Sequence, residues 1–326
     1  MYFQKEKRMR EFNQVAIVDN VSQANAITHL EPTQIDVIFA TAILSLYMDL
    51  RIFCTNDSKL IEEVKNGDKN KLVIFDAGGE YDPDRLLFDR HQHGFEEHYY
   101  DFMKYATAGI IWKRFSMEIL LKYDCPVSQI ATVAEEVSRD LIHDIDVRGN
   151  GYIPACTEMS VSDAVELFSK NWDEGSTCEN VSFIESVQFA RLILDGKIRK
   201  SISVARAHSK MAKWIATSSG GVFVMDTLIA DWEKYVLKSP NTKAKQLIYG
   251  VYPTNGEWRV QSIPPALNRP RDARKTLPVG WCGMSGERLV KKTGVKTATF
   301  CHPNCLIAGA LTFDDALKLA HLALLH

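Results

Sequence analysis

The sequence predicts an α/β fold in which a mostly parallel sheet is flanked by helices and a smaller α/β domain follows. In the first half of the chain, short β-branched and aromatic runs alternate with helical patterns, as they do when helices connect parallel strands. After the cluster Ser218-Ser219-Gly220-Gly221, strand patterns follow one another more closely. A length of 326 residues also suggests two domains rather than one.

The first-domain elements are assigned from these runs in chain order. Gln14–Asp19, Leu50–Thr55 and Leu72–Phe75 are predicted strands because each is a short apolar run. The predicted helices are Val37–Met48, Tyr105–Leu121, Val127–Ile142, Val161–Trp172 and Phe183–Lys200, which Ser201–Ala216 extends. Lys59–Lys71 is predicted to be a charged helix and turn. Parallel sheets bind ligands at the carboxyl ends of their strands, which is where Asp76 falls.

The second-domain elements are shorter. The predicted strands are Val222–Met225, Gln246–Val251, Trp258–Ile263, Thr299–His302 and Leu306–Ala308. Thr312–Leu325 is a predicted closing helix that Thr312 and Asp315 cap. We therefore expect a first domain at residues 1–195, a helical connector at 196–220 and a C-terminal substrate-binding α/β domain at 221–326.

Composition excludes several classes of protein. A formal net charge of -2 gives no global basic field for non-specific binding of long duplexes. No apolar run approaches the length of a membrane span, so we expect no membrane partner, and the basic start at residues 1–10 lacks the apolar core of a secretory signal. The seven cysteines are scattered without a C-x-x-C pair, which favours a reducing, intracellular compartment, whether cytoplasmic, nuclear or mitochondrial.

The stretch Lys71–Gly94 carries the densest chemistry in the chain. An apolar run ends at Asp76, two glycines and a Tyr-Asp-Pro turn follow, and a second apolar run ends in Asp89, Arg90, His91 and His93. Carboxylates and imidazoles at the ends of two neighbouring strands are typical of a metal-hydrolase site. A run of this kind is also compatible with ordinary loop polarity.

Four separated segments place such residues at predicted strand ends or helix starts: His29 with Asp36, Asp76, Asp89 with His91, and Asp146. Oxygen ligands with imidazole suit Mn²⁺ or Mg²⁺. Two such ions activate water and hold a phosphoryl group in line, and Asp76, central in the sheet, is the natural bridging ligand. The alternative for each residue alone is that it caps a helix or a turn.

Phe75–Phe95, FDAGGEYDPDRLLFDRHQHGF, resembles the central motif of the melanocyte-proliferating-gene family, which belongs to the DHH-type phosphoesterases together with exonucleases and type II pyrophosphatases. The resemblance covers nearly the whole chain. Further matching segments are Thr28–Ala40, Tyr105–Trp112 (YATAGIIW), Ile145–Gly151, Asp231–Val236 (DWEKYV), Trp258–Pro264 (WRVQSIP) and Phe300–Ala310 (FCHPNCLIAGA).

The resemblance implies a DHH domain with two Mn²⁺ ions and a smaller domain that closes on substrate. The metal-ligand positions that it implies are His29, Asp36, Asp76 and Asp146. His91 falls on the histidine that contacts phosphate in relatives, and His302 and Gly309 fall on substrate-contacting landmarks of the second domain.

This chain departs from the family pattern at several positions. Gln34 replaces a histidine, Gly149 replaces a second carboxylate, and Ala308-Gly309 replaces a glycine pair. Arg90 replaces the metal-binding histidine of the DHH triplet, and an always-protonated guanidinium cannot coordinate a metal. Each implied metal position therefore loses a ligand, and Arg90 has an alternative role as a bidentate phosphate ligand.

A basic stretch in the second domain has two interpretations. Arg269, Arg271, Arg274 and Lys275 form either a solvated loop or a phosphate-contacting strip for short single-stranded nucleic acid, with Trp258 and Trp281 for base stacking. Cys301, His302 and Cys305 have the appearance of a metal cluster, but without a second pair a packed strand end is favoured.

Two functions follow. The first is a metal-dependent phosphoesterase, a 3′–5′ exonuclease-like hydrolase of RNA or short nucleotides, in which Asp76 anchors the ions and His91 and Arg90 steady the phosphate. The second is a catalytically impaired member that binds nucleotide or RNA, or acts as a scaffold subunit. A homo-oligomer or a place in a larger assembly fits either function.

Overall fold

The structure, a computed structural model, describes residues 12–30, 33–67, 72–152, 158–173 and 179–326. The chain divides into two compact units, Met1–Ser203 and Val204–His326. The basic start at 1–10, Pro32 and Lys71 lie outside the described residues.

The first unit is built on a six-stranded sheet with the order β1-β3-β2-β4-β6-β5. Its strands are β1 Val15–Ile17, β2 Ala26–Thr28, β3 Leu50–Cys54, β4 Val73–Phe75, β5 Tyr81–Asp82 and β6 Leu87–Phe88. All neighbours pair in parallel except β5, which pairs antiparallel with β6 at the edge. The central strands β2 and β4 are wholly buried, as expected for a parallel sheet covered by helices.

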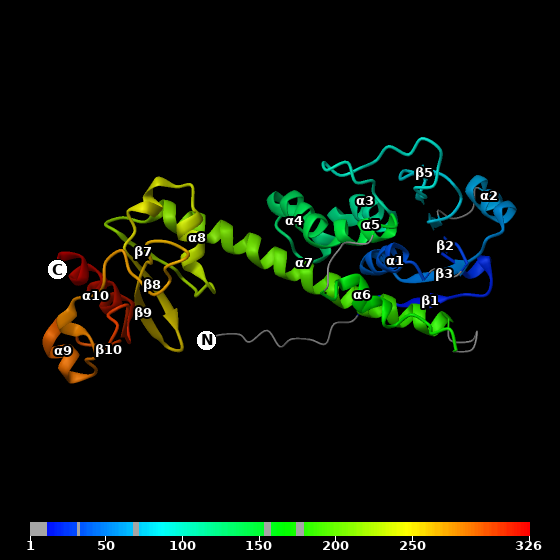
Figure 1. Cartoon of the computed structure of the whole chain (residues 1–326). Helices are drawn as coiled ribbons and strands as arrows, with labels where there is room; N and C mark the ends of the chain where they lie inside the picture. Colours follow the sequence, from blue (N-terminus) through cyan, green and yellow to red (C-terminus); the bar gives the residue numbers. More distant parts are fainter. Residues whose placement is uncertain (1–11, 31–32, 68–71, 153–157, 174–178) are drawn as a thin grey trace. The chain divides into compact units, whose positions relative to one another are not determined.

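Helices of the first unit pack on this sheet and on one another (Figure 1). They are α1 Ile35–Tyr47, α2 Ser58–Asn66, α3 Thr107–Lys122, α4 Ile130–Val137, α5 His143–Gly149, α6 Val161–Glu166 and α7 Glu179–Thr217, which continues into the second unit. Short 3-10 turns lie at Val21–Gln23 and Val127–Gln129, and a π-helical turn lies at Ser138–Ile142.

Helix α1 places a carboxylate, Asp36, in the protein core. Every residue from Ile35 to Leu46 is buried, because α1 is apolar around its whole circumference and packs against α3 and α5. Asp36 is the one acidic residue of its first turn, and it is carried into the interior with the helix. The fold therefore forces a carboxylate into the core beside the ends of the central strands.

The second unit is a five-stranded sheet with the order β10-β11-β9-β8-β7, in which β7 and β8 pair in parallel and the other neighbours pair antiparallel. Its strands are β7 Val222–Val224, β8 Tyr249–Thr254, β9 Glu257–Ser262, β10 Ala298–Cys301 and β11 Ile307–Ala310. Its helices are α8 Trp232–Lys238, α9 Glu287–Thr293 and α10 Phe313–Leu325, with 3-10 turns at Thr242–Lys245 and Val279–Trp281.

The predicted fold class is confirmed, and the largest differences concern short elements. The predicted helix Val127–Ile142 is divided into a 3-10 turn, α4 and a π-helical turn. Within the predicted helix and turn at 59–71, the helix ends at Asn66 and Gly67 is its C-cap. Strands β2 and β5 were not predicted, because two or three residues are too few to show a period, whereas β6 lies in the second apolar run that precedes Asp89.

Two of the cysteines are paired. Cys282 and Cys305 are joined by a disulfide, whereas Cys54, Cys125 and Cys301 keep their thiols. The scattered spacing gave no signal for this pair, because a loop of the second unit brings together two cysteines that are 23 residues apart. The reducing compartment stays a prediction. Within the described ranges, no helix combines the length and apolarity that crossing a bilayer requires.

Candidate metal centre

Asp76 lies at the centre of the site because β4 ends there. Its backbone has φ 52°, a left-handed conformation that aspartate tolerates better than most residues. Its N–H donates to the carbonyl of Phe88 at 2.9 Å, which ties the end of β4 to the end of β6. The Asp76 carboxylate is buried and accepts a 2.6 Å hydrogen bond from the Thr107 hydroxyl.

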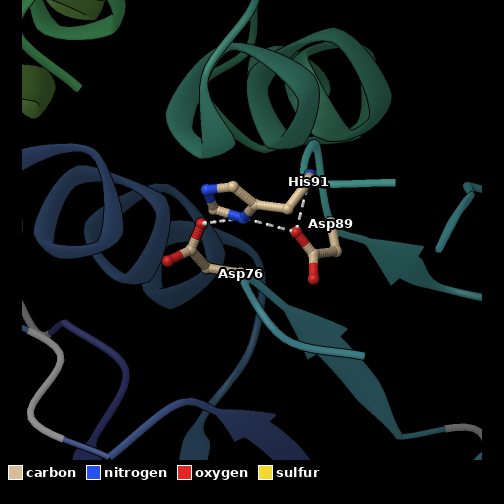
Figure 2. A group of neighbouring side chains, drawn as sticks. All are labelled: Asp76, Asp89 and His91. Carbon is tan, nitrogen blue, oxygen red and sulfur yellow. Dashed lines mark hydrogen bonds and ion pairs between the residues drawn. The ribbon is translucent and has the colours of Figure 1, made fainter. Parts of the chain in front are cut away.

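Asp89 and His91 join Asp76 from the neighbouring strand, since both follow β6 (Figure 2). The His91 Nδ1 lies 2.8 Å from Asp89 Oδ1 and 3.9 Å from Asp76 Oδ1. Backbone N–H groups of His91 and Gly79 donate to the two oxygens of Asp89 at 2.9 and 2.7 Å, which fixes that carboxylate. One ligand atom from each of Asp76, Asp89 and His91 lies within 4.8 Å of the others.

His29 approaches the same carboxylate from β2. Its Nδ1 lies 2.7 Å from the carbonyl of Leu30, so in the neutral ring Nδ1 carries the proton and the lone pair is on Nε2. That Nε2 is buried without a hydrogen-bond partner and lies 3.1 Å from Asp76 Oδ2. A buried ring nitrogen aimed at a carboxylate in this way is a ready metal ligand.

The first turn of α3 holds the two other predicted carboxylates. Ala106, at the N-cap, offers no side-chain acceptor, so the first-turn N–H groups need partners from elsewhere. The Thr107 N–H donates to Asp36 Oδ2 at 3.4 Å, and the Gly109 N–H donates to Asp146 Oδ1 at 2.9 Å. Asp36 and Asp146 therefore cap a helix whose positive end also favours their charge.

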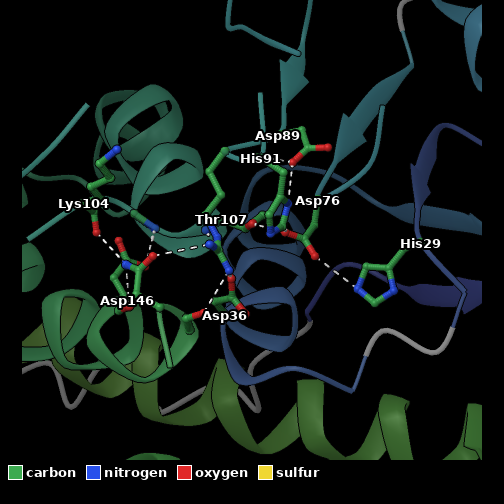
Figure 3. Close-up of polar contacts among 12 residues, drawn as sticks. His29, Asp36, Asp76, Asp89, His91, Lys104, Thr107 and Asp146 are labelled. Atoms are coloured by element: carbon green, nitrogen blue, oxygen red, sulfur yellow. Dashed lines mark hydrogen bonds and ion pairs between the residues drawn. The ribbon is translucent and has the colours of Figure 1, made fainter. Parts of the chain in front are cut away.

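Asp146 is enclosed tightly in this position. The Tyr99 hydroxyl donates to its second oxygen at 2.9 Å, and Asp146 is fully buried. A Cβ on Gly109 would lie 1.9 Å from Asp146 Oδ2, so only glycine fits there. Figure 3 shows Asp146 on the side of the cluster away from His29. Both Asp146 oxygens are thus used within the protein, and Asp146 is not in the group of close ligand atoms.

The Arg90 side chain contacts Asp36 and the end of α5. Its Nη2 donates to the carbonyl of Gly149 at 2.9 Å, its Nη1 donates to Asn150 Oδ1 at 3.4 Å, and its Nε lies 3.7 Å from Asp36 Oδ2. Gly149 and Asn150 end α5, where carbonyl groups carry partial negative charge. Arg90 therefore pairs with Asp36 and caps α5 at the same time.

The pKa values of these carboxylates are shifted in different directions. Burial alone would raise the pKa of Asp76 and of Asp89, but contacts with His29 and Thr107, and with His91 and Gly79, outweigh it and lower both pKa values. Burial raises the pKa of Asp36, and the charge of Arg90 only partly offsets this. Burial also raises the pKa of Asp146 to about 7.

The pKa values of the two histidines are raised, in contrast to those of Asp76 and Asp89. The contact with Asp76 raises the pKa of His29, and the hydrogen bond with Asp89 raises the pKa of His91. Both rings are therefore readily cationic at this edge, and a divalent cation bound among the same carboxylates would compete with their protons.

The donor set fits one divalent ion. Asp76, Asp89 and His91 supply two carboxylates and an imidazole at ligand spacing, and His29 adds its Nε2, which lies 3.1 Å from Asp76 Oδ2. A mixed oxygen and imidazole set suits Mn²⁺ or Mg²⁺. The residues around Asp36 do not fit a second ion, because the guanidinium of Arg90 faces the carboxylate and cannot serve as a ligand.

The predicted second-unit residues lie on separate elements. His302 is exposed, and its Nδ1 accepts from the N–H of Asn304 at 3.2 Å. Gly309, in the middle of β11, has Arg259 packed over it, since a Cβ there would lie 2.3 Å from Arg259 Nη1. Arg274 Nη1 donates to the carbonyls of Ala244 and Leu247, both at 2.7 Å, so Arg274 holds its own loop in place.

Several site residues were missed from the sequence or given another role. Asp89 was in the polar cluster but was left out of the ligand set, although its position directly after the second apolar run was a sufficient signal. Thr107 and Tyr99 gave no signal, because only the folded chain brings them to Asp76 and Asp146. Arg259 gave none because its partner Gly309 is far along the chain.

Searches of solved structures give similar chains at low TM-score. One is RecJ in complex with Mn²⁺ from Thermus thermophilus, with 12% identity and a TM-score of 0.25, covering 94% of this chain and 53% of that chain. This chain thus spans about half the length of that protein. Another is exonuclease RecJ bound to manganese, with 11% identity and a TM-score of 0.24, covering 93% and 91%.

Similar sequences extend over nearly the whole chain. The MYG1 protein of Dictyostelium discoideum is 25% identical over 331 residues, covering 92% of this chain and 96% of its own length. The MYG1 exonuclease of Homo sapiens is 25% identical over 327 residues, covering 91% and 85%. The family model MYG1_exonuc, described as "Uncharacterised protein family (UPF0160)", matches residues 25–324. The resemblance inferred from the motifs is confirmed, and the chain belongs to the MYG1_exonuc family.

Proposed function

We propose that this protein is a metal-dependent phosphodiester hydrolase that removes nucleotides from RNA ends or cleaves short nucleotides in the 3′–5′ direction. The observation that carries the proposal is the group of Asp76, Asp89 and His91 at the carboxyl edge of the parallel sheet. Ligand sites of such sheets lie at this edge. The family membership and the relatives named exonuclease support the same activity.

The proposed ion is Mn²⁺ or Mg²⁺, held by Asp76, Asp89 and His91 with His29 at its side. When bound, such an ion activates water and stabilises charge on a phosphoryl oxygen. The protein supplies the orientation. The Thr107 hydroxyl holds one oxygen of Asp76, and the N–H groups of His91 and Gly79 hold the Asp89 carboxylate. The ligands are therefore positioned before an ion binds, which lowers the cost of reorganisation.

Substrate binding is proposed beside His29. A cavity of about 350 Å³ lies there, lined by Thr55, Asn56, Ser58, Ile61, Ala77 and Gly78 among others. This volume is in the range of small-molecule sites, and its mixed apolar and polar walls suit a nucleobase with its ribose. Ala77 and Gly78 directly follow Asp76, so a nucleoside in the cavity would place its phosphate at the metal group.

The second unit is proposed to bind the rest of the substrate, with His302 and Gly309 as contact positions. Arg259 joins this set, because its guanidinium lies over the ring of Phe300 at 4.5 Å and beside Gly309. Arg274 is better placed to stabilise its loop than to reach a phosphate. Short single-stranded nucleic acid stays the proposed partner.

The test uses two substrates. Purified protein with Mn²⁺ is expected to shorten a 5′-labelled short RNA from its 3′ end and to hydrolyse bis(p-nitrophenyl) phosphate. Asp76→Asn is expected to reduce both rates by about 10³-fold, since the central ligand is lost. The control is Asp144→Asn, an exposed carboxylate on α5 that should leave both rates unchanged. Absence of turnover in the wild type, or equal rates in wild type and Asp76→Asn, would refute the proposal.

One observation favours a second function, a catalytically impaired protein that binds nucleotide. Arg90 replaces the expected histidine and pairs with Asp36, so part of the usual ligand set is missing. Under this alternative the RNA would bind and remain intact, and Asp76→Asn would not alter its affinity. Measuring the dissociation constant and the cleavage rate on the same preparation separates the two.

A further inference from the structure

Asp36 is a buried carboxylate that needs a positive partner. It is fully buried in the first turn of α1, and its Oδ1 has no hydrogen-bond partner. Its other oxygen accepts only a long bond, 3.4 Å, from the Thr107 N–H. A carboxylate in such a place is stable only when a cation offsets the loss of water.

Arg90 is held where it supplies that cation. Its side chain is only 16% exposed, and three of its nitrogens face Asp36, Gly149 and Asn150. Asn150 is itself fixed, since its Nδ2 donates to the carbonyls of Lys104 and Asp146 at 2.7 and 2.9 Å. The guanidinium is therefore held between α1 and the end of α5.

The backbone excludes a replacement ligand at Gly149. A Cβ at this position would lie 2.7 Å from both Cβ and Cγ of Asp36. No carboxylate-bearing residue can take this place without moving α1 or α5. Asp146, another acidic residue nearby, already accepts bonds from Tyr99 and Gly109. Around Asp36 the charge is thus balanced by Arg90 without an ion, while Asp36 Oδ1 has no hydrogen-bond partner.

We propose that Arg90 is a built-in second cation: its guanidinium occupies the charge position beside Asp36, so the protein binds one divalent ion, at Asp76, Asp89 and His91, instead of two. A second divalent ion beside Asp36 would meet the fixed positive charge of Arg90, and of the oxygens of Asp36 and Asp146 only Asp36 Oδ1 is without a hydrogen-bond partner. This inference rests on the proposed function, because it concerns the same metal centre. The number of bound ions can nevertheless be measured without any catalytic turnover.

The experiment counts ions by calorimetric titration of the metal-free wild type with Mn²⁺. One ion per chain is expected. Arg90→His removes the fixed charge and provides an imidazole, so a second ion is expected to bind about tenfold or more tightly than in the wild type. Arg90→Lys keeps the charge and should remain at one ion. Arg85→His is the matched control, because Arg85 is exposed and pairs with Glu80.

Each outcome decides the question. Two ions of comparable affinity in the wild type, or none, would overturn the proposal. An Arg90→His variant that is folded by circular dichroism and still binds one ion with unchanged affinity would also overturn it. If Arg90→His does not fold, the ion number of wild type and Arg90→Lys decides. Bis(p-nitrophenyl) phosphate hydrolysis on the same samples separates this test from the proposed function: one ion without turnover supports Arg90 as the cation and refutes the hydrolase.

Discussion

The two halves of the centre are made from the same residue types and are organised in opposite ways. Asp76, Asp89 and His91 lie close together with ligand atoms facing one another, and His29 adds a ring nitrogen without a hydrogen-bond partner. In the other half, Asp36 and Asp146 cap the first turn of α3, and Arg90 balances the charge. Carboxylates at a sheet edge are therefore ligands in one half and helix caps in the other.

This difference shows what decides the role of a buried carboxylate. Ala106 leaves the first turn of α3 without a local cap, so that turn takes its acceptors from α1 and α5. At the ends of β4 and β6, by contrast, the ligand atoms of Asp76, Asp89 and His91 lie close together. The N–H of Gly79 donates to the Asp89 carboxylate and holds it in this position. The groups that each carboxylate faces, more than its place in a motif, separate the two roles.

The largest expected effect compares one carboxylate from each half. Asp89→Asn should weaken Mn²⁺ binding by about 100-fold, because a charged ligand is lost and an amide N–H₂ group would oppose the N–H of Gly79 or His91. Asp146→Asn should change Mn²⁺ affinity little. Titration with a fluorescent chelator as competitor measures both. Equal losses in the two variants would mean that Asp146 is a ligand, as the motifs predicted, and the comparison would fail.

The next effect concerns stability and its dependence on pH. Arg90→Ala leaves Asp36 buried without its cation and should cost about 2–4 kcal/mol of unfolding free energy at pH 8. The pKa of Asp36 is already higher in the folded protein than in the unfolded chain, so the protein loses stability as pH rises through these pKa values and Asp36 ionises. Removing Arg90 raises the folded-state pKa further, which enlarges this loss. The loss should therefore be smaller at pH 5.

Urea denaturation at both pH values measures this difference. Arg85→Ala is the control, since its exposed pair with Glu80 should contribute less than about 1 kcal/mol. An Arg90→Ala loss that is the same at pH 5 and pH 8 would show that the charge of Asp36 is not what Arg90 stabilises.

The smallest expected effect sharpens the comparison from the substrate side, because the cavity adjoins only the half that contains His29. Ser58→Trp should fill the cavity and raise KM for short RNA by about tenfold while leaving hydrolysis of bis(p-nitrophenyl) phosphate unchanged. Lys59→Trp, one residue further along α2, is the control. Equal effects of Ser58→Trp on both substrates would place the nucleoside elsewhere.

Much of the fold and part of the site could be predicted from the sequence. The apolar run before Asp76 showed a buried strand, and α1 and α10 begin close to their predicted positions. These are long or strongly patterned segments. His29 was predicted as a site residue without its strand, because β2 has only three residues. The sequence could also identify Arg90 as a departure from the family pattern, since that required only the motif.

The direction of the Arg90 side chain could not be predicted. Its partners Asp36, Gly149 and Asn150 are far from it in the chain, and only the packing of α1 against α5 brings them together. The capping role of Asp146 was hidden for the same reason, since Tyr99 and Gly109 belong to other segments. Sequence patterns show which polar groups are present, whereas tertiary packing decides which of them form hydrogen bonds with one another.

The most direct test of a one-ion centre is anomalous diffraction at the manganese edge from crystals grown with excess Mn²⁺. The two halves predict one strong peak, in contact with Asp76, Asp89 and His91, and none within bonding distance of Asp36. A second peak of similar height beside Asp36, with the Arg90 guanidinium displaced from Gly149, would contradict the account.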